Sequence, residues 1–293
     1  MHFPIAQVTV NPLLLALVGF VIGVLGGFFG VGGGFLAGPV MFMLGVPMNF
    51  VVGTDLTHIA GKSVVAARRH WILGHVDFRL GLLMILGTVP GVELGAQIIE
   101  SLEQAHAVDQ VIGSIYVVLL VAIGTFMAWE GWQAVRRGQA PADGRPVRGR
   151  RILQAMRAFR LSPVIRLPVS GIESISVWTI LGVGFVVGLL GGMLGVGGGF
   201  LRMPALIYLV GVPTHVAIGT DLFEIIFSAG YGTVTHALKG NVDIMMALVM
   251  HTGAAIGAQF GALSTVHFSG PKIRLGFSLL PFVGALLVLN KLV

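Results

Sequence analysis

The sequence predicts an all-α polytopic membrane protein made of two homologous, inverted repeats, each with a broken glycine-rich helical hairpin and three transmembrane helices. Composition, an internal duplication and the length of the apolar segments predict this fold. Of 293 residues, 55% are hydrophobic and only 10% are charged, whereas a soluble chain carries about 25% charged residues. This composition excludes a cytosolic enzyme and an intrinsically disordered chain.

The net charge of +6 does not indicate a nucleic-acid partner, because it is concentrated in one segment. Residues 136–166 hold nine arginines and one acid, Asp143, so this segment is +8 and the rest of the chain is −2. Cysteine is absent, which excludes disulfides and thiolate metal sites. The first residues lack the positively charged segment of a secretory signal, so we expect the first apolar run to belong to the mature protein.

An internal duplication divides the chain. Residues 19–44 align with 184–209 at an offset of 165, with 16 of 26 positions identical. After one inserted residue the offset becomes 166, and GVPMNFVVGTDL (45–56) matches GVPTHVAIGTDL (211–222). We therefore expect a first transmembrane repeat at 12–135, an Arg-rich cytoplasmic linker at 136–171 and a second transmembrane repeat at 172–293.

Each repeat contains three apolar segments of about 20 residues, the length that crosses a hydrocarbon core of about 30 Å. The segments 12–44 and 174–210 are too long for one crossing, and a Gly-Val-Gly-Gly-Gly run followed by prolines interrupts both. We interpret each as two helical pieces joined by a glycine-rich turn. The uninterrupted helices are expected at 50–68, 79–99, 110–132, 214–236, 243–264 and 272–291.

The Arg-rich linker is expected on the cytoplasmic side, because positively charged loops stay inside. Counting back three crossings also places Arg68 and Arg69 inside. If each broken segment enters and leaves on one side, the repeats are inverted, and Lys272 and Arg274 lie inside as well. Parallel repeats would place that pair outside, so the charges favour inverted repeats in the inner (plasma) membrane. Residues 152–160 form either an amphipathic helix on anionic headgroups or a solvated connector.

The two glycine turns are the expected substrate site. Paired Gly-interrupted hydrophobic segments indicate the binding site of a transporter, because the end of a half-helix presents free N–H groups and glycine lets an anion come close. Packing of small residues is the alternative, and it explains the glycines of the preceding helices better. A dinucleotide fingerprint is excluded by the apolar context. The candidate anion contacts are Gly30, Gly32, Gly33, Gly34, Gly195, Gly197, Gly198 and Gly199.

The duplicated pattern G-x-L-G-G-x-x-G-V-G-G-G-F-L-x-x-P, followed by G-V-P and G-T-D-L, resembles the sulfite exporter TauE/SafE family, also called the toluene-sulfonate uptake permeases. The resemblance covers nearly the whole chain. It implies secondary transport, by alternating access, of a small organosulfur anion such as sulfite, a sulfonate or a sulfoacetate-like compound. It leaves the substrate and the direction of transport open.

Ionisable residues at membrane depth are candidate functional residues. Asp55, His58 and Lys62 lie at i, i+3 and i+7, on one face of a helix, and could relay a proton or hold a coupling cation. Asp221 and Glu224 stand at the places of Asp55 and His58 in the second repeat. An internal ion pair is one alternative, and helix capping by the two aspartates is another.

Arg202 replaces Ala37 of the first repeat, three residues after the last glycine of the turn. Its guanidinium could bind a sulfonate or carboxylate through two parallel hydrogen bonds, or extend to the membrane surface. Thr54 and Thr220, which precede the two aspartates, complete the candidate substrate contacts.

Two other functions remain as alternatives. A divalent metal-cation transporter would use His58, His70, His75 and Asp55, although their spacing is not a compact ligand set. An intramembrane enzyme is disfavoured, because HExxH, GxSxG and P-loop motifs are absent. His70, His75 and His236 are expected to be solvated at helix ends. The expected partners are a small anion, the lipid bilayer and a coupling proton or sodium ion; no cofactor is expected, and a homodimer is left open.

Overall fold

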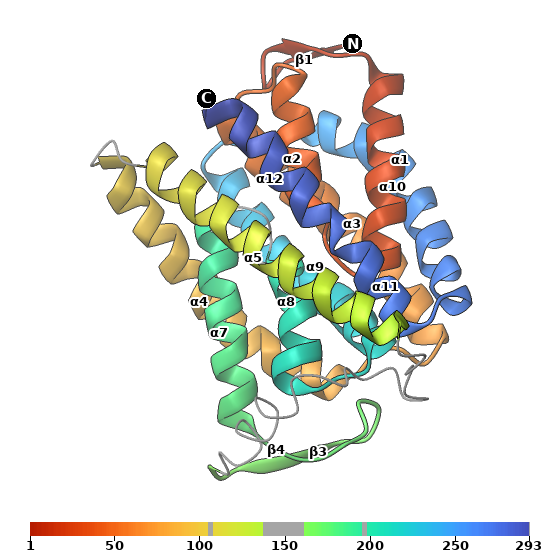
Figure 1. Ribbon diagram of the computed structural model, residues 1–293. Coiled ribbons are helices and arrows are strands. Elements are labelled where there is room, and N and C mark those ends of the chain that lie inside the picture. Colours follow the sequence, from red (N-terminus) through yellow and green to blue (C-terminus); the bar gives the residue numbers. More distant parts are fainter. Residues whose placement is uncertain (105–107, 137–160, 195–197, 293) are drawn as a thin grey trace.

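The structure is a computed structural model that describes residues 1–104, 108–136, 161–194 and 198–292. It is mainly helical (Figure 1). The helices of the first half are α1 (Pro12–Phe29), α2 (Gly34–Met43), α3 (Met48–Ile72), α4 (Phe78–Gln104) and α5 (Val108–Arg136). Those of the second half are α7 (Val177–Leu194), α8 (Gly199–Ala205), η1 (Leu206–Val210, a π-helix), α9 (Thr214–Leu238), α10 (Ile244–Ser264), η2 (Thr265–His267), α11 (Gly270–Phe277) and α12 (Leu279–Leu292).

The expectation of a helical membrane protein is confirmed. Four of the described helical segments are long and apolar enough to cross a membrane: Pro12–Phe29, Phe78–Gly95, Val117–Arg136 and Ile244–His267. The helices α3 and α9 carry buried charged residues instead, which lowers their hydropathy. The linker prediction for 152–160 lies outside the described residues.

One expected helix is wrong. The segment 272–291 is two helices, α11 and α12, which meet at Ser278. The Ser278 hydroxyl donates to the carbonyl of Leu275 at 2.6 Å, a local bond that competes with the helical pattern. Pro281, at the start of α12, has no N–H to donate to the preceding turn, so the helix is interrupted there.

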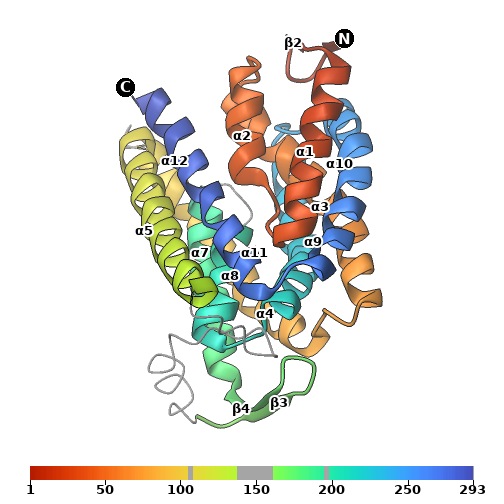
Figure 2. The same ribbon diagram turned by 45° about the vertical axis from the view of Figure 1, so that its right-hand side comes forward.

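Both broken segments are present. In the first, α1 ends at Phe29, Gly30 and Gly33 adopt left-handed conformations (φ 77° and 81°), and α2 begins at Gly34. In the second, Gly198 is left-handed (φ 71°) and precedes α8. Figure 2 shows α1 and α2 at the end of the molecule that holds the N-terminus, and α7 and α8 toward the opposite end. The first broken segment therefore turns back at Gly30–Gly33, and the second continues into α8 directly after Gly198.

Helices of the two halves exchange partners. Gly19, Gly23 and Gly27 of α1 lie on the backbone of α10, as expected for packing glycines, and a Cβ at Gly23 would come 2.8 Å from the Cα of Ala254. The equivalent Gly188 of α7 lies on α4 in the same way, with 2.8 Å to the Cα of Thr88. Because only glycine permits such close backbone contact, the two repeats are packed into one another.

A two-stranded hairpin precedes each broken segment. The first pairs β1 (His2–Phe3) with β2 (Val8–Thr9), and the second pairs β3 (Val164–Leu167) with β4 (Ile172–Ser176). Asp243 caps α10 and accepts a bond from the backbone of Ala6, while Asp77 accepts bonds from Ser170 and from the amide of Leu80 in α4. Each hairpin is thus joined to the start of a helix in the other repeat.

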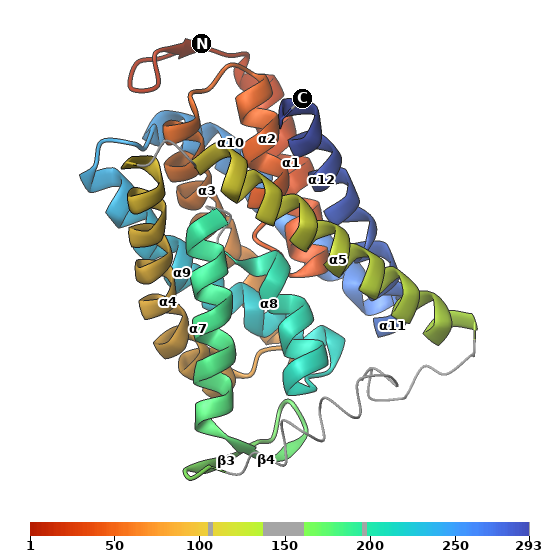
Figure 3. The same ribbon diagram turned by 60° about the vertical axis from the view of Figure 1, so that its left-hand side comes forward.

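The helices α5 and α12 lie side by side on the outside of the molecule (Figure 3). Arg274 of α11 pairs with Glu130 of α5 through two bonds, of 2.9 and 3.1 Å, and donates to Thr214. Tyr208 of the π-helix also donates to Glu130, at 2.8 Å. Arg274 was counted as a cytoplasmic charge in predicting the orientation, but it is fully buried, where this network neutralises it.

Candidate functional site

The two glycine turns touch each other at the centre of the molecule. A Cβ at Gly199 would lie 2.8 Å from the amide nitrogen of Gly32 and 2.9 Å from the Cδ1 of Ile225. A Cβ at Gly32 would lie 2.9 Å from the Cγ2 of Ile59. Ile59 and Ile225 are equivalent residues of the two repeats, and both are fully buried. The structure therefore brings the two predicted turns together, with an isoleucine from each repeat beside the contact.

A buried cation lies against the left-handed glycine of each turn. The Nζ of Lys62 lies 2.8 Å from the Cβ position of Gly33, and the Nη2 of Arg202 lies 3.2 Å from that of Gly198. Both cations are 1% exposed. Since Gly33 and Gly198 are equivalent in the duplication, the two repeats present the same pairing of glycine and cation.

In the first repeat, Asp55, His58 and Lys62 follow one face of α3, as predicted. The Nδ1 of His58 lies 3.3 Å from the Oδ1 of Asp55, and the Nζ of Lys62 donates to the carbonyl of Ile22 at 3.4 Å. All three residues are at most 2% exposed. Because a carboxylate accepts only, the Nδ1–H of His58 donates to Asp55.

In the second repeat, Arg202 holds two acids of α9. Its Nη1 donates to the Oδ1 of Asp221 at 2.9 Å and contacts the Oε2 of Glu224. Ser228 donates to the same Oε2 at 3.2 Å. The guanidinium therefore does not extend to the surface, and its Nε and Nη2 have no hydrogen-bond partner in the described part of the chain.

The capping alternative for the two aspartates is wrong. The helices α3 and α9 begin at Met48 and Thr214, and the residues that cap them are Pro47 and Pro213. Asp55 and Asp221 lie two turns inside these helices, where no free N–H group remains to be capped. Their carboxylates instead contact His58 and Arg202.

The structure joins Thr54 and Thr220 to backbone amides and shows no hydrogen bond from either to the cations among the described residues. The Thr54 hydroxyl accepts from the amide of Asp243, and that of Thr220 accepts from the amide of Asp77, each at 3.0 Å. Both threonines therefore hold the start of a helix in the other repeat. Gly34 begins α2, while Gly195 and Gly197 lie outside the described residues.

The expectation of a solvated His70 is wrong. Its side chain is fully buried, because the Nε2 lies 2.9 Å from the carbonyl oxygen of Gly27 and the Nδ1 lies 3.2 Å from the Nδ1 of His75. His75, in the loop between α3 and α4, is half-buried, and the centroid of the His215 ring lies 5.2 Å from that of His75, with the rings tilted by 43°. Burial and the nearby His215 lower the pKa of His75 from 6.5 to about 4.

The metal alternative gains no support. His58 has Asp55 as its partner, whereas His70 and His75 contact each other at the end of α3. Among the described residues, no group of three or more histidine, aspartate or glutamate side chains could hold a metal ion.

Two features could not be expected from sequence patterns. The carbonyl of Ile22, which binds Lys62, belongs to the backbone and leaves no signature in the side chains. The pairing of Glu130 with Arg274 joins residues 144 positions apart. In the sequence, Lys62, Glu130 and Arg274 therefore look like isolated charges, because no nearby residue indicates the partner of any of them.

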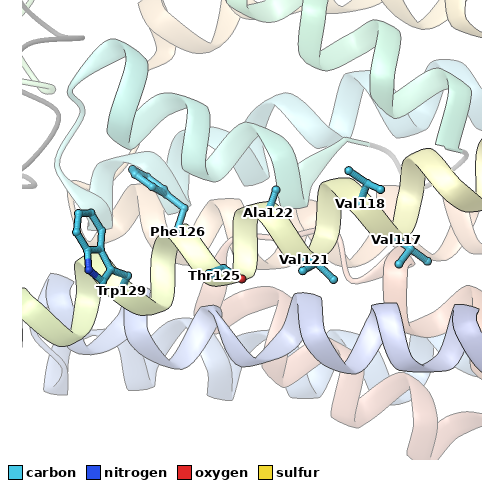
Figure 4. Close-up of a pocket in the computed structure, with 7 residues that line it drawn as sticks. All are labelled: Val117, Val118, Val121, Ala122, Thr125, Phe126 and Trp129. Carbon is cyan, nitrogen blue, oxygen red and sulfur yellow. The ribbon is translucent and has the colours of Figure 1, made fainter.

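An apolar hollow of about 670 Å³ lies along α5 (Figure 4). Every residue that lines it belongs to α5: Val117, Val118, Val121, Ala122, Thr125, Phe126 and Trp129. The lining contains no charged side chain that could bind an anion, so the candidate site remains the buried centre.

The fold and this centre define a multi-pass membrane protein with ionisable side chains buried between two repeats. The family model described as sulfite exporter TauE/SafE matches residues 15–288. The chain therefore belongs to this family of membrane transporters, as the sequence motifs predict.

Named relatives agree with this class. The probable membrane transporter protein YunE of Bacillus subtilis is 28% identical over 258 residues, which is 85% of this chain and 87% of the relative. A probable membrane transporter protein of Xylella fastidiosa is 29% identical over 87% of this chain and 84% of its own length. Over 35% of this chain and 25% of its own length, the sulfite exporter TauE/SafE family protein 5 of Arabidopsis thaliana is 34% identical. The comparison with solved structures gave no significant match.

Proposed function

We propose that this protein is a secondary transporter that carries a small organosulfur anion, such as sulfite, a sulfonate or a sulfoacetate-like compound, across the plasma membrane. The observation that carries the proposal is the pair of buried cations, Lys62 and Arg202, each against a left-handed glycine where the two broken segments meet. Cations and exposed backbone amides are the groups that bind oxyanions in proteins. The sulfur chemistry comes from the name of the family, sulfite exporter TauE/SafE.

Alternating access between inverted repeats is the proposed mechanism. Its support is the exchange of equivalent glycine contacts, α1 on α10 and α7 on α4, and the position of the two broken segments toward opposite ends (Figure 2). Rocking of two equivalent halves about a central site would expose that site to each side in turn. With the Arg-rich linker in the cytoplasm, β3 and β4 would lie on the cytoplasmic side and β1 and β2 on the other.

Ion coupling is part of the proposal. Asp55 and His58 in the first repeat, and Asp221 and Glu224 in the second, are buried acids and bases on α3 and α9, the helices whose Ile59 and Ile225 contact the glycine turns. The group of Arg202, Asp221 and Glu224 has one cation for two acids, so a proton or a sodium ion would complete its charge balance in an environment of low dielectric constant. A homodimer stays a prediction.

Transport by the purified protein in liposomes tests the proposal. We expect saturable uptake of ³⁵S-labelled sulfite, inhibited by a small sulfonate such as methanesulfonate and changed by an imposed pH or sodium gradient. Protein-free liposomes and uptake of labelled Zn²⁺ are the controls. Absence of anion flux under every imposed gradient, or flux of the metal alone, would overturn the proposal.

A further inference from the structure

Each repeat has a cradle for a charged group, formed by a left-handed glycine, a residue of the preceding helix and a buried cation. The side chains that supply the cation and its partners differ between the two cradles. In each repeat a left-handed glycine, Gly33 or Gly198, lies between a residue of the preceding helix and a buried cation; that residue is Ile22 in the first repeat and Val187 in the second. Ile22 and Val187 are equivalent in the duplication. The cations are not, because the first repeat draws its cation from α3 and the second from α8.

In the second repeat the protein's own acids pair with the cation through Nη1, while the Nη2 beside Gly198 has no hydrogen-bond partner among the described residues. Glu224 stands at the position of His58 and contacts Arg202 through Oε2, and Asp221 binds the same guanidinium nitrogen. One cation facing two buried carboxylates has an excess of negative charge. A further anion at this place would be repelled strongly, because little water screens the charges.

The cradle of the first repeat has no such acid. His58, which carries no negative charge, is the residue equivalent to Glu224. The acid on the same face of α3, Asp55, contacts His58. An ammonium group has three donors, and the Nζ of Lys62 has the Ile22 carbonyl as an acceptor at 3.4 Å. Within the described residues, no carboxylate oxygen lies within 4.0 Å of this Nζ.

Unsatisfied donors and acceptors mark the same place. The Nε2 of His58 is buried and has no hydrogen-bond partner in the described ranges. His58 lies one turn from Lys62 on the same face of α3, and His251 of α10 approaches that helix at Gly61, with its Cε1 2.8 Å from the Cβ position. A buried ammonium with spare donors is expensive unless an anion completes it. With the Nδ1–H of His58 on Asp55, the Nε2 would donate to the same anion when the imidazole is protonated.

We propose that the transported anion binds in the first repeat, on Lys62 beside Gly33 and His58, and that Glu224 of the second repeat occupies the corresponding place as a built-in anion. This inference rests on the proposed function and locates its binding site. It assigns substrate binding to Lys62 and makes Arg202 the counter-ion of Asp221 and Glu224. The bound group is an oxyanion, a sulfite or a sulfonate head, whose oxygens accept from the ammonium.

The test copies the second repeat into the first with His58→Glu. The new carboxylate should pair with Lys62 as Glu224 pairs with Arg202, so the variant should fold and lose affinity for sulfite and for methanesulfonate by about 100-fold or more. His58→Gln, which adds no charge, should lose no more than about tenfold. His267→Glu makes the same exchange at an exposed histidine in η2 and should bind as the wild type does. Affinity is measured by calorimetry and by thermal stabilisation of the detergent-solubilised protein.

Lys62→Gln decides the question if His58→Glu fails to fold. This variant removes the charge of the cradle and should lose anion binding to the same extent. Binding by folded Lys62→Gln or folded His58→Glu within threefold of the wild type would overturn the inference, whereas wild-type transport in liposomes would still support the proposed function. Failure of the wild type to bind or move any anion would instead overturn the proposed function itself.

Discussion

Lys62 and Arg202 reach equivalent places from positions that do not align. Lys62 corresponds to Ser228 in the second repeat, and Arg202 corresponds to Ala37 in the first. By alignment each looks like a feature of one repeat alone. In space both charged groups lie beside the left-handed glycine of their own turn, because a long side chain can arrive from either neighbouring helix. The same charge at the centre is therefore supplied twice, by different elements.

Two of the three histidines at one end of the molecule, His75 and His215, have asparagine as the equivalent residue in the other repeat. His75 and His215 correspond to Asn241 and Asn49, while His70 corresponds to His236. The His75 pKa, lowered to about 4 by burial and by His215, makes this end sensitive to acid. Below pH 6.5 the unfolded chain takes up a proton at this residue that the folded protein does not, so the free energy of unfolding falls as the pH drops toward 4.

We predict that His75→Asn removes this acid sensitivity. Asparagine can still donate to the Nδ1 of His70, so the contact is kept while the titration is lost. Between pH 6.5 and 4 the wild type should lose about 1–2 kcal/mol more than the variant, a figure reduced for the half-exposed side chain. Thermal unfolding across this range measures the difference. His267→Asn should keep the wild-type slope, and an unchanged slope in His75→Asn would show that the titrating group lies elsewhere.

At the scale of elements, stripes of glycine decide which helices pack together. Gly184, Gly188 and Gly192 place α7 on the backbone of α4, and their equivalents Gly19, Gly23 and Gly27 place α1 on α10. In a bilayer, apolar side chains gain little by leaving lipid, so helices associate through close backbone contact. The spacing of these glycines therefore specifies the exchange of partners between the repeats.

We predict that Gly188→Ala destabilises the protein by about 1–3 kcal/mol, because its methyl group would overlap the backbone of α4 at Thr88. Gly182→Ala in the same helix is the matched control, since a Cβ there has no heavy atom within 4 Å. Thermal unfolding in detergent should show a lower midpoint for Gly188→Ala and little change for Gly182→Ala. Equal midpoints would argue against close packing of α7 on α4.

At the scale of the whole molecule, the two hairpins lie at opposite ends (Figure 1). The β1 and β2 strands adjoin the start of α1, and β3 and β4 adjoin the start of α7. With equivalent helices starting at opposite ends, inverted repeats in the membrane predict opposite exposure of the two hairpins. The natural chain contains no cysteine, so a single introduced thiol reports its side without background.

We predict that Thr9→Cys and Glu173→Cys react from opposite sides of the membrane. Both residues are exposed, in β2 and β4 respectively. A membrane-impermeant maleimide added to intact cells should label Thr9→Cys, and it should label Glu173→Cys only after the membrane is permeabilised. Labelling of both in intact cells would contradict inverted repeats.

Much of the fold follows from local patterns. The apolar segments and the paired Gly-Val-Gly-Gly-Gly interruptions predict most of the helices and both turns, because length and backbone freedom act locally. The break at Ser278 was missed, because the segment 272–291 has the length of one membrane crossing and Pro281 within it was not recognised as a break. Burial of His70 was also missed, because its acceptor, the Gly27 carbonyl, is 43 residues away.

By itself the sequence determined the class of protein, the duplication and the buried ionisable residues, since composition and spacing act along the chain. Only the tertiary structure decided what those residues touch. Arg202 holds Asp221 and Glu224, Lys62 lies beside Gly33, and Thr54 and Thr220 bind the other repeat. These contacts join helices that are distant in sequence. Close packing of glycine-lined helices decides which helices are neighbours, and therefore which side chains can neutralise each buried charge.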